Sequence, residues 1–227
     1  SVDPSAGSVT AMHHHILHVR DADKHATVTE IAARQGRVLM FLDTKHAVDK
    51  LTRHLLDSGV RAAALHGGKS QPQRTGTLAQ FKTGHVTVLV ATNVAARGIH
   101  VDNLDLVVNV DPPSDHKDYL HRGGRTARAG ESGSVVTLVL PNQRRDMSRL
   151  IATAGISAQT TAVSPGQAEL SRITGARTPS GVPVTISSPT AQRPRHAASS
   201  ALKQQRHRSA QASRSARPPR AQEAPSA

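Results

Sequence analysis

The sequence predicts an α/β domain built on a parallel sheet, followed by a disordered basic tail. Short runs rich in Val and Leu alternate with longer stretches of helical periodicity from about His13 to Gly155. Strands that alternate with helices in this way favour a parallel sheet whose two faces are both covered by helices. After Gly155 the apolar runs nearly vanish, and Ser, Ala, Pro, Gln and Arg dominate.

Six apolar runs are typical of buried strands, because each is short and is bounded by turn-forming or charged residues. His13, His14 and His15 precede the first run and could form a short metal-binding tract or a tag remnant. Three consecutive imidazoles in a strand cannot all face one ion, so we interpret them as the start of that strand and predict no metal site. The six runs are residues 16–19, 38–42, 62–65, 86–91, 106–110 and 135–140.

Helical spacing occupies the stretches between these runs. Thr44 and Ser70 stand where N-caps belong, and Gly155 is a suitable C-cap. We therefore expect one domain at residues 13–155, with its functional residues in loops after the carboxyl ends of the strands. The predicted helices are residues 22–34, 45–56, 71–82, 116 to about 129, and 144–154.

Charge separates the tail from the domain. The formal net charge is +13, and residues 156–227 hold 10 Lys and Arg against only Glu169 and Glu223, which gives the tail +8 of that total. Such a segment cannot bury enough apolar surface to offset the entropy of ordering, so we expect residues 156–227 to be disordered. A flexible polycation favours nucleic acid as the partner. A membrane surface is less suitable, because the tail has no amphipathic apolar face.

Several protein classes are excluded by composition. The chain has no Cys, which rules out disulfides and thiolate metal sites. No apolar stretch approaches the roughly 20 residues of a membrane span, and the N-terminus lacks the basic and apolar regions of a signal peptide. We therefore expect no membrane partner and a cytoplasmic protein.

Glycines and polar residues gather in three segments, each of which follows a predicted strand. The segments are residues 66–74 (HGGKSQPQR), 92–100 (TNVAARGIH) and 119–130 (YLHRGGRTARAG). In the third, Arg122, Arg125 and Arg128 recur at a spacing of three and should gather along one side of a helix. Guanidinium groups this close repel one another unless they share an anion, for which phosphate is the natural candidate. The alternative is a solvated basic helix face.

These segments resemble motifs of the DEAD-box RNA helicases. Residues 121–130 resemble motif VI, and residues 91–99 resemble motif V. Residues 71–74, which follow the His-Gly pair, resemble motif IVa, and residues 38–44 resemble motif IV. The four motifs occur in the family's order and spacing. The resemblance implies the C-terminal RecA-like lobe of an ATP-dependent RNA helicase.

The resemblance also implies a role for each residue that matches a motif. Arg125 and Arg128 would be the catalytic residues, as arginine fingers that reach the γ-phosphate of an ATP held mainly by the other lobe. Contacts to ATP and to the other lobe would come from His121, Arg122, Gly124, His100 and Gly98. Contacts to the RNA backbone would come from Gly67, Gly68, Gln71, Arg74, Thr92, Asn93 and Arg97.

Two positions depart from the family's usual pattern. His100 replaces the Asp that commonly ends motif V, and Asn93 stands where an Asp is common. The Asp that His100 replaces is associated with the nucleotide ribose. A neutral imidazole can still form one hydrogen bond, so the departure leaves open the affinity and pH dependence of nucleotide binding.

Two elements of the family's ATP site are missing from the sequence. It contains neither the P-loop pattern G-x-x-x-x-G-K-[ST] nor a D-E-x-D box, and residues 1–12 are typical of an interlobe linker remnant. We therefore expect ATP and Mg²⁺ to bind only with an N-terminal lobe supplied in cis or in trans, and we expect the chain alone to be inactive. Two alternatives remain open. One is a stand-alone RNA-binding or chaperone module without ATPase activity, and the other is a lobe of a related DNA helicase.

Overall fold

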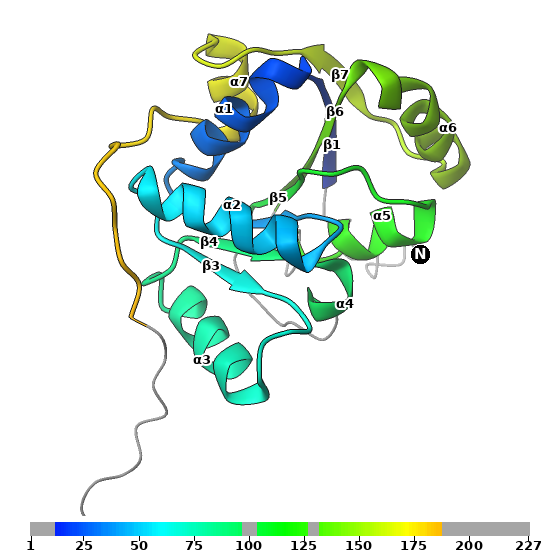
Figure 1. Ribbon diagram of the computed structural model, residues 1–227. Coiled ribbons are helices and arrows are strands. Elements are labelled where there is room, and N and C mark those ends of the chain that lie inside the picture. Colours follow the sequence, from blue (N-terminus) through cyan, green and yellow to red (C-terminus); the bar gives the residue numbers. More distant parts are fainter. Residues whose placement is uncertain (1–11, 97–103, 127–131, 188–227) are drawn as a thin grey trace, which may run out of the picture. The chain divides into compact units, whose positions relative to one another are not determined.

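A seven-stranded parallel sheet forms the centre of the protein (Figure 1). The computed structural model describes residues 12–96, 104–126 and 132–187. Neighbouring strands follow the order β3-β4-β2-β5-β6-β1-β7, and every neighbouring pair is parallel. The strands are β1 Met12–His18, β2 Val38–Phe41, β3 Ala62–Leu65, β4 Val88–Ala91, β5 Leu106–Asn109, β6 Gly133–Val139 and β7 Gln159–Ala162. The predicted fold class and all six predicted strands are confirmed.

Helices cover both faces of this sheet. They are α1 Asp21–Ala32, α2 Lys45–Asp57, α3 Gln71–Lys82, α4 Asn93–Ala96, α5 His116–Gly123, α6 Arg144–Ala154 and α7 Ala168–Thr174, with a 3₁₀ turn at Pro141–Gln143. Side chains of α1, α2 and α7 share one apolar cluster with Met40, while α3 and α4 share another with Leu39 and Phe41. Because neighbouring residues of β2 point to opposite faces, these clusters lie on opposite sides of the sheet.

The helix ends follow the caps that the sequence provides. The Thr44 hydroxyl accepts a hydrogen bond from the Ala47 N–H at 3.1 Å and begins α2. Ser70 and Gln73 form a reciprocal capping box at the start of α3. Gly155 ends α6 with φ of 65°, a conformation that costs glycine little. All three predicted caps are confirmed.

The ordered domain extends well beyond Gly155, so the boundary predicted there is wrong. Strand β7 pairs with β1 on the side away from β6. Helix α7 buries Leu170 in the apolar cluster that α1 and α2 share. Residues 177–187, which we call the strap, continue along the domain: the Gly181 N–H donates to the Ser58 carbonyl and the Val184 N–H to the Leu56 carbonyl. The sequence conceals β7 because this edge strand is polar and mostly exposed.

The helix predicted from residue 116 to about 129 is shorter than expected. It ends at Gly123, and residues 124–126 form a turn that is not helical. Residues 127–131 lie outside the described part of the chain, as do residues 1–11, 97–103 and 188–227. No helix among the described residues combines the length and the apolar character that crossing a lipid bilayer requires.

Candidate functional site

The carboxyl ends of all seven strands meet at one edge of the sheet, because every pair is parallel. Asp43 follows β2, His66 follows β3, Thr92 follows β4 and Asp111 follows shortly after β5. Loops at this edge of an open α/β sheet are where ligands bind. The segments that the sequence singled out after β3 and β4 therefore lie where a site is expected.

The glycine pair after β3 is held in place by a buried histidine. His66 is 4% exposed, and its Nδ1 accepts a hydrogen bond from the Gly68 N–H at 3.1 Å. The proton of a neutral imidazole must then lie on Nε2, which faces the two carboxylate oxygens of Asp49 at 2.9 and 3.0 Å. Gly67 and Gly68 are exposed, so their backbone can approach a ligand closely.

Asp49, whose carboxylate faces His66, is a residue of this site that the sequence did not reveal. Partial burial opposes its ionisation, but the hydrogen bond from His66 and the charge of Lys69 outweigh that effect and lower the pKa of Asp49. The Lys69 ammonium lies 3.3 Å from the same carboxylate. Asp49 lies in α2 outside every motif that the sequence offers, so only the packing of α2 against β3 reveals its role.

Helix α3 brings the next predicted residues to the same edge. Gln71 is exposed in its first turn, and Arg74 is half-buried with one guanidinium nitrogen donating to the Ala95 carbonyl at 3.1 Å. The Nε of Arg74 is buried and has no partner among the described residues. The Thr92 N–H donates to the Leu65 carbonyl at 3.2 Å, which places Thr92 beside the loop that follows β3.

A separate cavity of about 250 Å³ lies between the ends of β2, α4 and α5. It is lined by Phe41, Asn93, Ala96, His121 and Arg125. Three predicted site residues from two distant segments thus surround one hollow. Their guanidinium, imidazole and amide groups suit phosphate or other anionic oxygens. Gly124 is exposed next to them at the end of α5.

Arg122 does not share this cavity, which corrects the prediction of one arginine row. Its side chain is 3% exposed and donates to the Asn109 side-chain oxygen at 3.3 Å and to the Asp111 carbonyl at 3.1 Å. The guanidinium also lies 5.2 Å from the centre of the Phe41 ring and 3.6 Å from a carboxylate oxygen of Asp43. Arg122 lies within α5 and turns into the domain, whereas Arg125 lies beyond the end of the helix at Gly123.

Two carboxylates that the site prediction omitted join this arrangement. Asp111 accepts from the Lys24 ammonium at 2.9 Å and from the Asp43 N–H at 3.2 Å. Burial and the nearby charge of Asp111 raise the pKa of Asp43, although Arg122 acts in the opposite direction. The loops after β2 and β5 are therefore tied together under α5.

Several predicted site residues lie outside the described part of the chain: Arg97, Gly98, His100 and Arg128. Among the described residues, no group of three or more His, Asp or Glu is arranged to hold a metal ion. Mg²⁺ prefers oxygen ligands, and the cavity beside Arg125 offers it only the amide oxygen of Asn93. The side chains described around this cavity therefore suit anionic oxygens better than they suit a Mg²⁺ ion.

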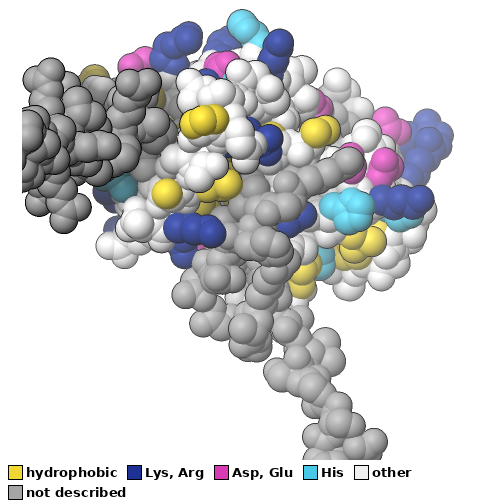
Figure 2. Space-filling view, turned by 90° about the horizontal axis from the view of Figure 1, so that it is seen from below, with side chains coloured by type: hydrophobic (Ala, Val, Ile, Leu, Met, Phe, Trp, Pro, Cys, Tyr) yellow, Lys and Arg dark blue, Asp and Glu magenta, His cyan; other side chains and the backbone are white. Residues whose placement is uncertain are grey.

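The face seen from below in Figure 2 carries Lys and Arg side chains in several places, with Asp, Glu, His and apolar side chains among them.

Comparison with known proteins gives matches in the same part of the chain. Residues 23–130 match the family described as "Helicase conserved C-terminal domain". Over 125 residues the chain is 43% identical to the "Pre-mRNA-processing ATP-dependent RNA helicase PRP5" of Mycosarcoma maydis, which covers 55% of this chain and 11% of that protein. The chain spans about a tenth of the length of the curated relatives it matches.

Solved structures give similar matches. The E. coli DEAD-box protein SrmB, bound to regulator of ribonuclease activity A, is 31% identical with a TM-score of 0.59, over 74% of this chain and 98% of that one. S. cerevisiae Dbp5, bound to RNA and ADP BeF3, is 29% identical with a TM-score of 0.62, over 67% of this chain and 42% of that one. Both alignments cover at least two thirds of this chain.

Proposed function

Because the chain belongs to the DEAD-box RNA helicase family through its helicase C-terminal domain, we propose that it supplies the arginine fingers and half of the RNA groove of an ATP-dependent RNA helicase. The observation that carries the proposal is the cavity at which Asn93, His121 and Arg125 meet. The RNA-binding half rests on the loops after β3 and β4, which share the same edge of the sheet.

On the nucleotide side, Arg125 would face the γ-phosphate of an ATP that an N-terminal lobe binds. Its guanidinium stays charged at every accessible pH and would stabilise negative charge that develops during phosphoryl transfer. Arg128 would act as the second finger. Arg122 would act differently: its contacts with Asn109 and Asp111 hold the end of α5, so it would position Arg125 without touching phosphate.

On the RNA side, the groups available suit the sugar-phosphate backbone. Gly67 and Gly68 are exposed and let the sugar-phosphate backbone approach closely, and the exposed Gln71 and half-buried Arg74 lie at the same edge of the sheet. The chain has three aromatic residues in all, and Phe41, Phe81 and Tyr119 are each at most 1% exposed. Bases therefore have no aromatic side chain to stack on, and binding should be salt-sensitive and largely independent of sequence.

Two lines support RNA and ATP as the ligands. The PRP5 relatives are named as ATP-dependent RNA helicases, and the similar Dbp5 structure contains RNA and ADP BeF3. The mechanism needs an N-terminal lobe, in cis or in trans, that provides the P-loop, the magnesium ligands and the attacking water. The lobe described here would then close onto that nucleotide and bring Arg125 to it.

The test measures ATP hydrolysis by the chain, with and without RNA, before and after an N-terminal DEAD-box lobe is added or fused. We expect no turnover by the chain alone and RNA-stimulated turnover with the added lobe. Arg125→Met should then lower the rate by at least about a thousandfold, as loss of an arginine finger does. Arg145→Met, at an exposed position on α6, is the matched control and should leave the rate unchanged.

Two results would contradict the proposal. RNA-stimulated hydrolysis by the chain alone would show that it needs no second lobe. Full activity of the Arg125→Met protein would remove the finger assignment.

Salt-sensitive RNA binding without any ATP-dependent change, even with the added lobe, would favour a stand-alone RNA-binding module. Equal affinity for RNA and DNA of one sequence would favour a DNA helicase lobe.

A further inference from the structure

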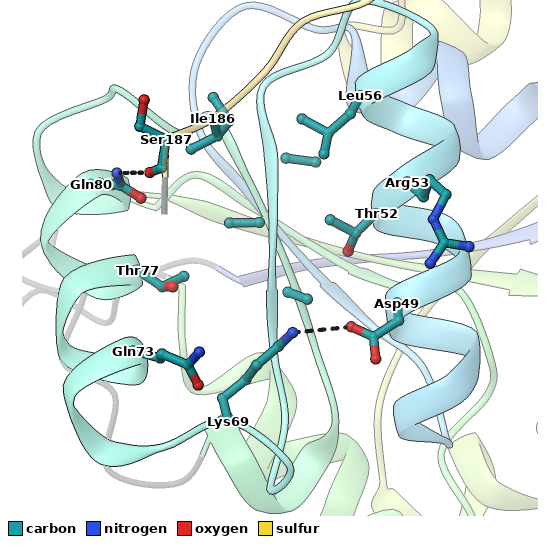
Figure 3. A pocket seen from close by; sticks show the side chains of 13 residues that line it. Asp49, Thr52, Arg53, Leu56, Lys69, Gln73, Thr77, Gln80, Ile186 and Ser187 are labelled. Carbon is teal, nitrogen blue, oxygen red and sulfur yellow. Dashed lines mark hydrogen bonds and ion pairs between the residues drawn. The ribbon is translucent and has the colours of Figure 1, made fainter. Parts of the chain in front are cut away.

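A groove runs along one edge of the sheet, between helices α2 and α3. It has a volume of about 510 Å³, and Figure 3 shows side chains of both helices flanking strand β3. Its floor is formed by Ala62, Ala63 and Ala64, and Arg53 of α2 and Thr77 of α3 stand on its two walls. We call this feature the edge groove. It shares no lining residue with the cavity beside Arg125.

The floor of the edge groove is the edge strand of the sheet, where Ala62 is buried and Ala63 and Ala64 are partly exposed. Strand β3 ends the sheet order and pairs only with β4 among the described residues. The Leu65 carbonyl accepts from Thr92 on the β4 side. Because bonding direction alternates along a strand, the N–H and C=O groups of Ala62 and Ala64 point away from β4. No described residue forms a hydrogen bond with them on that side.

An unpaired strand edge of this kind can template another extended segment. The approach is open at Ala64, which is partly exposed and whose methyl group is too short to cover the backbone. Helices α2 and α3 stand on either side of β3 in Figure 3. The space is therefore suited to a single additional strand.

One end of the edge groove already binds extended main chain. The strap reaches it after Val184, whose N–H donates to the Leu56 carbonyl at 2.9 Å. The side-chain amide of Gln80 donates to the Ser187 carbonyl at 3.0 Å, and Ile186 packs against the apolar cluster beneath (Figure 3). The strap residues form no ladder with β3, so the alanine floor stays free.

The charge of the edge groove favours an acidic occupant. Arg53 is exposed, and no described acidic residue pairs with it. Asp49 is the one acid in the lining, and it is already engaged by His66 and by Lys69, which is a third exposed. The lining therefore carries one excess positive charge, at the side chain of Arg53.

From these observations we propose that the edge groove binds an extended acidic segment of a partner protein, which adds to β3 as a further strand. Its backbone would form hydrogen bonds with the N–H and C=O groups of Ala64, the partly exposed residue whose backbone points away from β4. Alternate side chains would then point toward α2 and α3, and an acidic one would pair with Arg53. Because the edge groove and the cavity beside Arg125 share no lining residue, this binding needs neither ATP nor a second lobe.

The test selects peptides and then maps where they bind. A phage library of random dodecapeptides is selected on the immobilised full chain, and enriched peptides are synthesised and titrated against ¹⁵N-labelled protein. We expect enrichment of Asp or Glu at alternate positions and amide shift changes at Ala62, Ala64 and Thr77. The N–H groups of a bound strand point alternately toward β3 and away from it. Methylation of every second backbone nitrogen should therefore abolish binding when it removes the N–H groups that face β3, and should spare binding when it removes the others.

Charge reversal on α2 provides the matched variants. Arg53→Glu should weaken the peptide at least fivefold, because an attraction becomes a repulsion. Lys50→Glu makes the same change at an exposed position outside the edge groove and should alter the affinity by less than twofold. A library without enrichment would overturn the proposal, as would equal weakening by both variants. Shift changes confined to the strap would overturn it as well.

Discussion

Replacement of Arg122 by Met tests whether this arginine stabilises the fold or serves to bind an anion. The substitution keeps an apolar stem of similar length and removes the guanidinium. Two acceptors then lose their donor: the Asn109 side-chain oxygen, which is fully buried, and the Asp111 carbonyl. An unsatisfied buried acceptor costs about 1 to 3 kcal/mol.

The size of the effect follows from the exposure of each partner. Asp43 is 58% exposed, so its carboxylate becomes hydrated when Arg122 is removed and adds little to the loss. The contact with the Phe41 ring adds about 0.5 to 1 kcal/mol. Part of this loss is offset, because the substituted protein no longer has to bury the charge of a guanidinium group. We expect the free energy of unfolding to fall by about 2 to 3 kcal/mol.

Urea denaturation followed by circular dichroism measures this change, because the chain has no Trp and its single Tyr is buried. Arg145→Met is the control at an exposed position and should change the free energy of unfolding by less than about 0.5 kcal/mol. If Arg122 were held there for an anion, its removal would be neutral or stabilising. A loss below about 0.5 kcal/mol for Arg122→Met would therefore refute the structural role.

Three further predictions concern stability. Leu170→Ala should lower the free energy of unfolding by about 2 to 5 kcal/mol in urea denaturation, since this side chain is fully buried in the main core. A loss below about 0.5 kcal/mol would mean that α7 is not part of the folding unit. Gly59→Ala should cost clearly more than Gly84→Ala in thermal unfolding. Both glycines have positive φ, but only at Gly59 would a Cβ clash with the strap, at the Ser180 hydroxyl. Equal losses would contradict the docked strap. Burial and nearby positive charge lower the pKa of His25, so the unfolded chain binds more protons and stability falls as the pH drops below about 6.5. His25→Gln should reduce that fall in denaturation between about pH 7.5 and pH 5.5, and an unchanged slope would contradict it.

The predicted elements succeeded where apolar runs and caps were both present. Strands β2, β4 and β5 are buried along their whole length, so their apolar runs were unambiguous. The predicted bounds of α3 match the structure because Ser70 and Gln73 close a capping box at its start. The sequence missed β7 and α7 because β7 is a polar edge strand, whose side chains carry almost no apolar pattern. A composition argument made over residues 156–227 could not separate that strand from the tail.

The sequence by itself determined the fold class, the family resemblance and the carboxyl edge at which the motif residues gather, because these depend on local pattern and on strand order. Only the tertiary structure decided what each side chain faces. Arg122 and Arg125 are alike in sequence, yet one turns into the domain toward Asn109 and the other lines a cavity. Asp49 and the edge groove were likewise invisible, because they arise from helices packed against a strand that is distant along the chain. Such contacts depend on where a helix ends and on which side chains pack against it in the folded domain. The spacing of residues along the chain does not encode them.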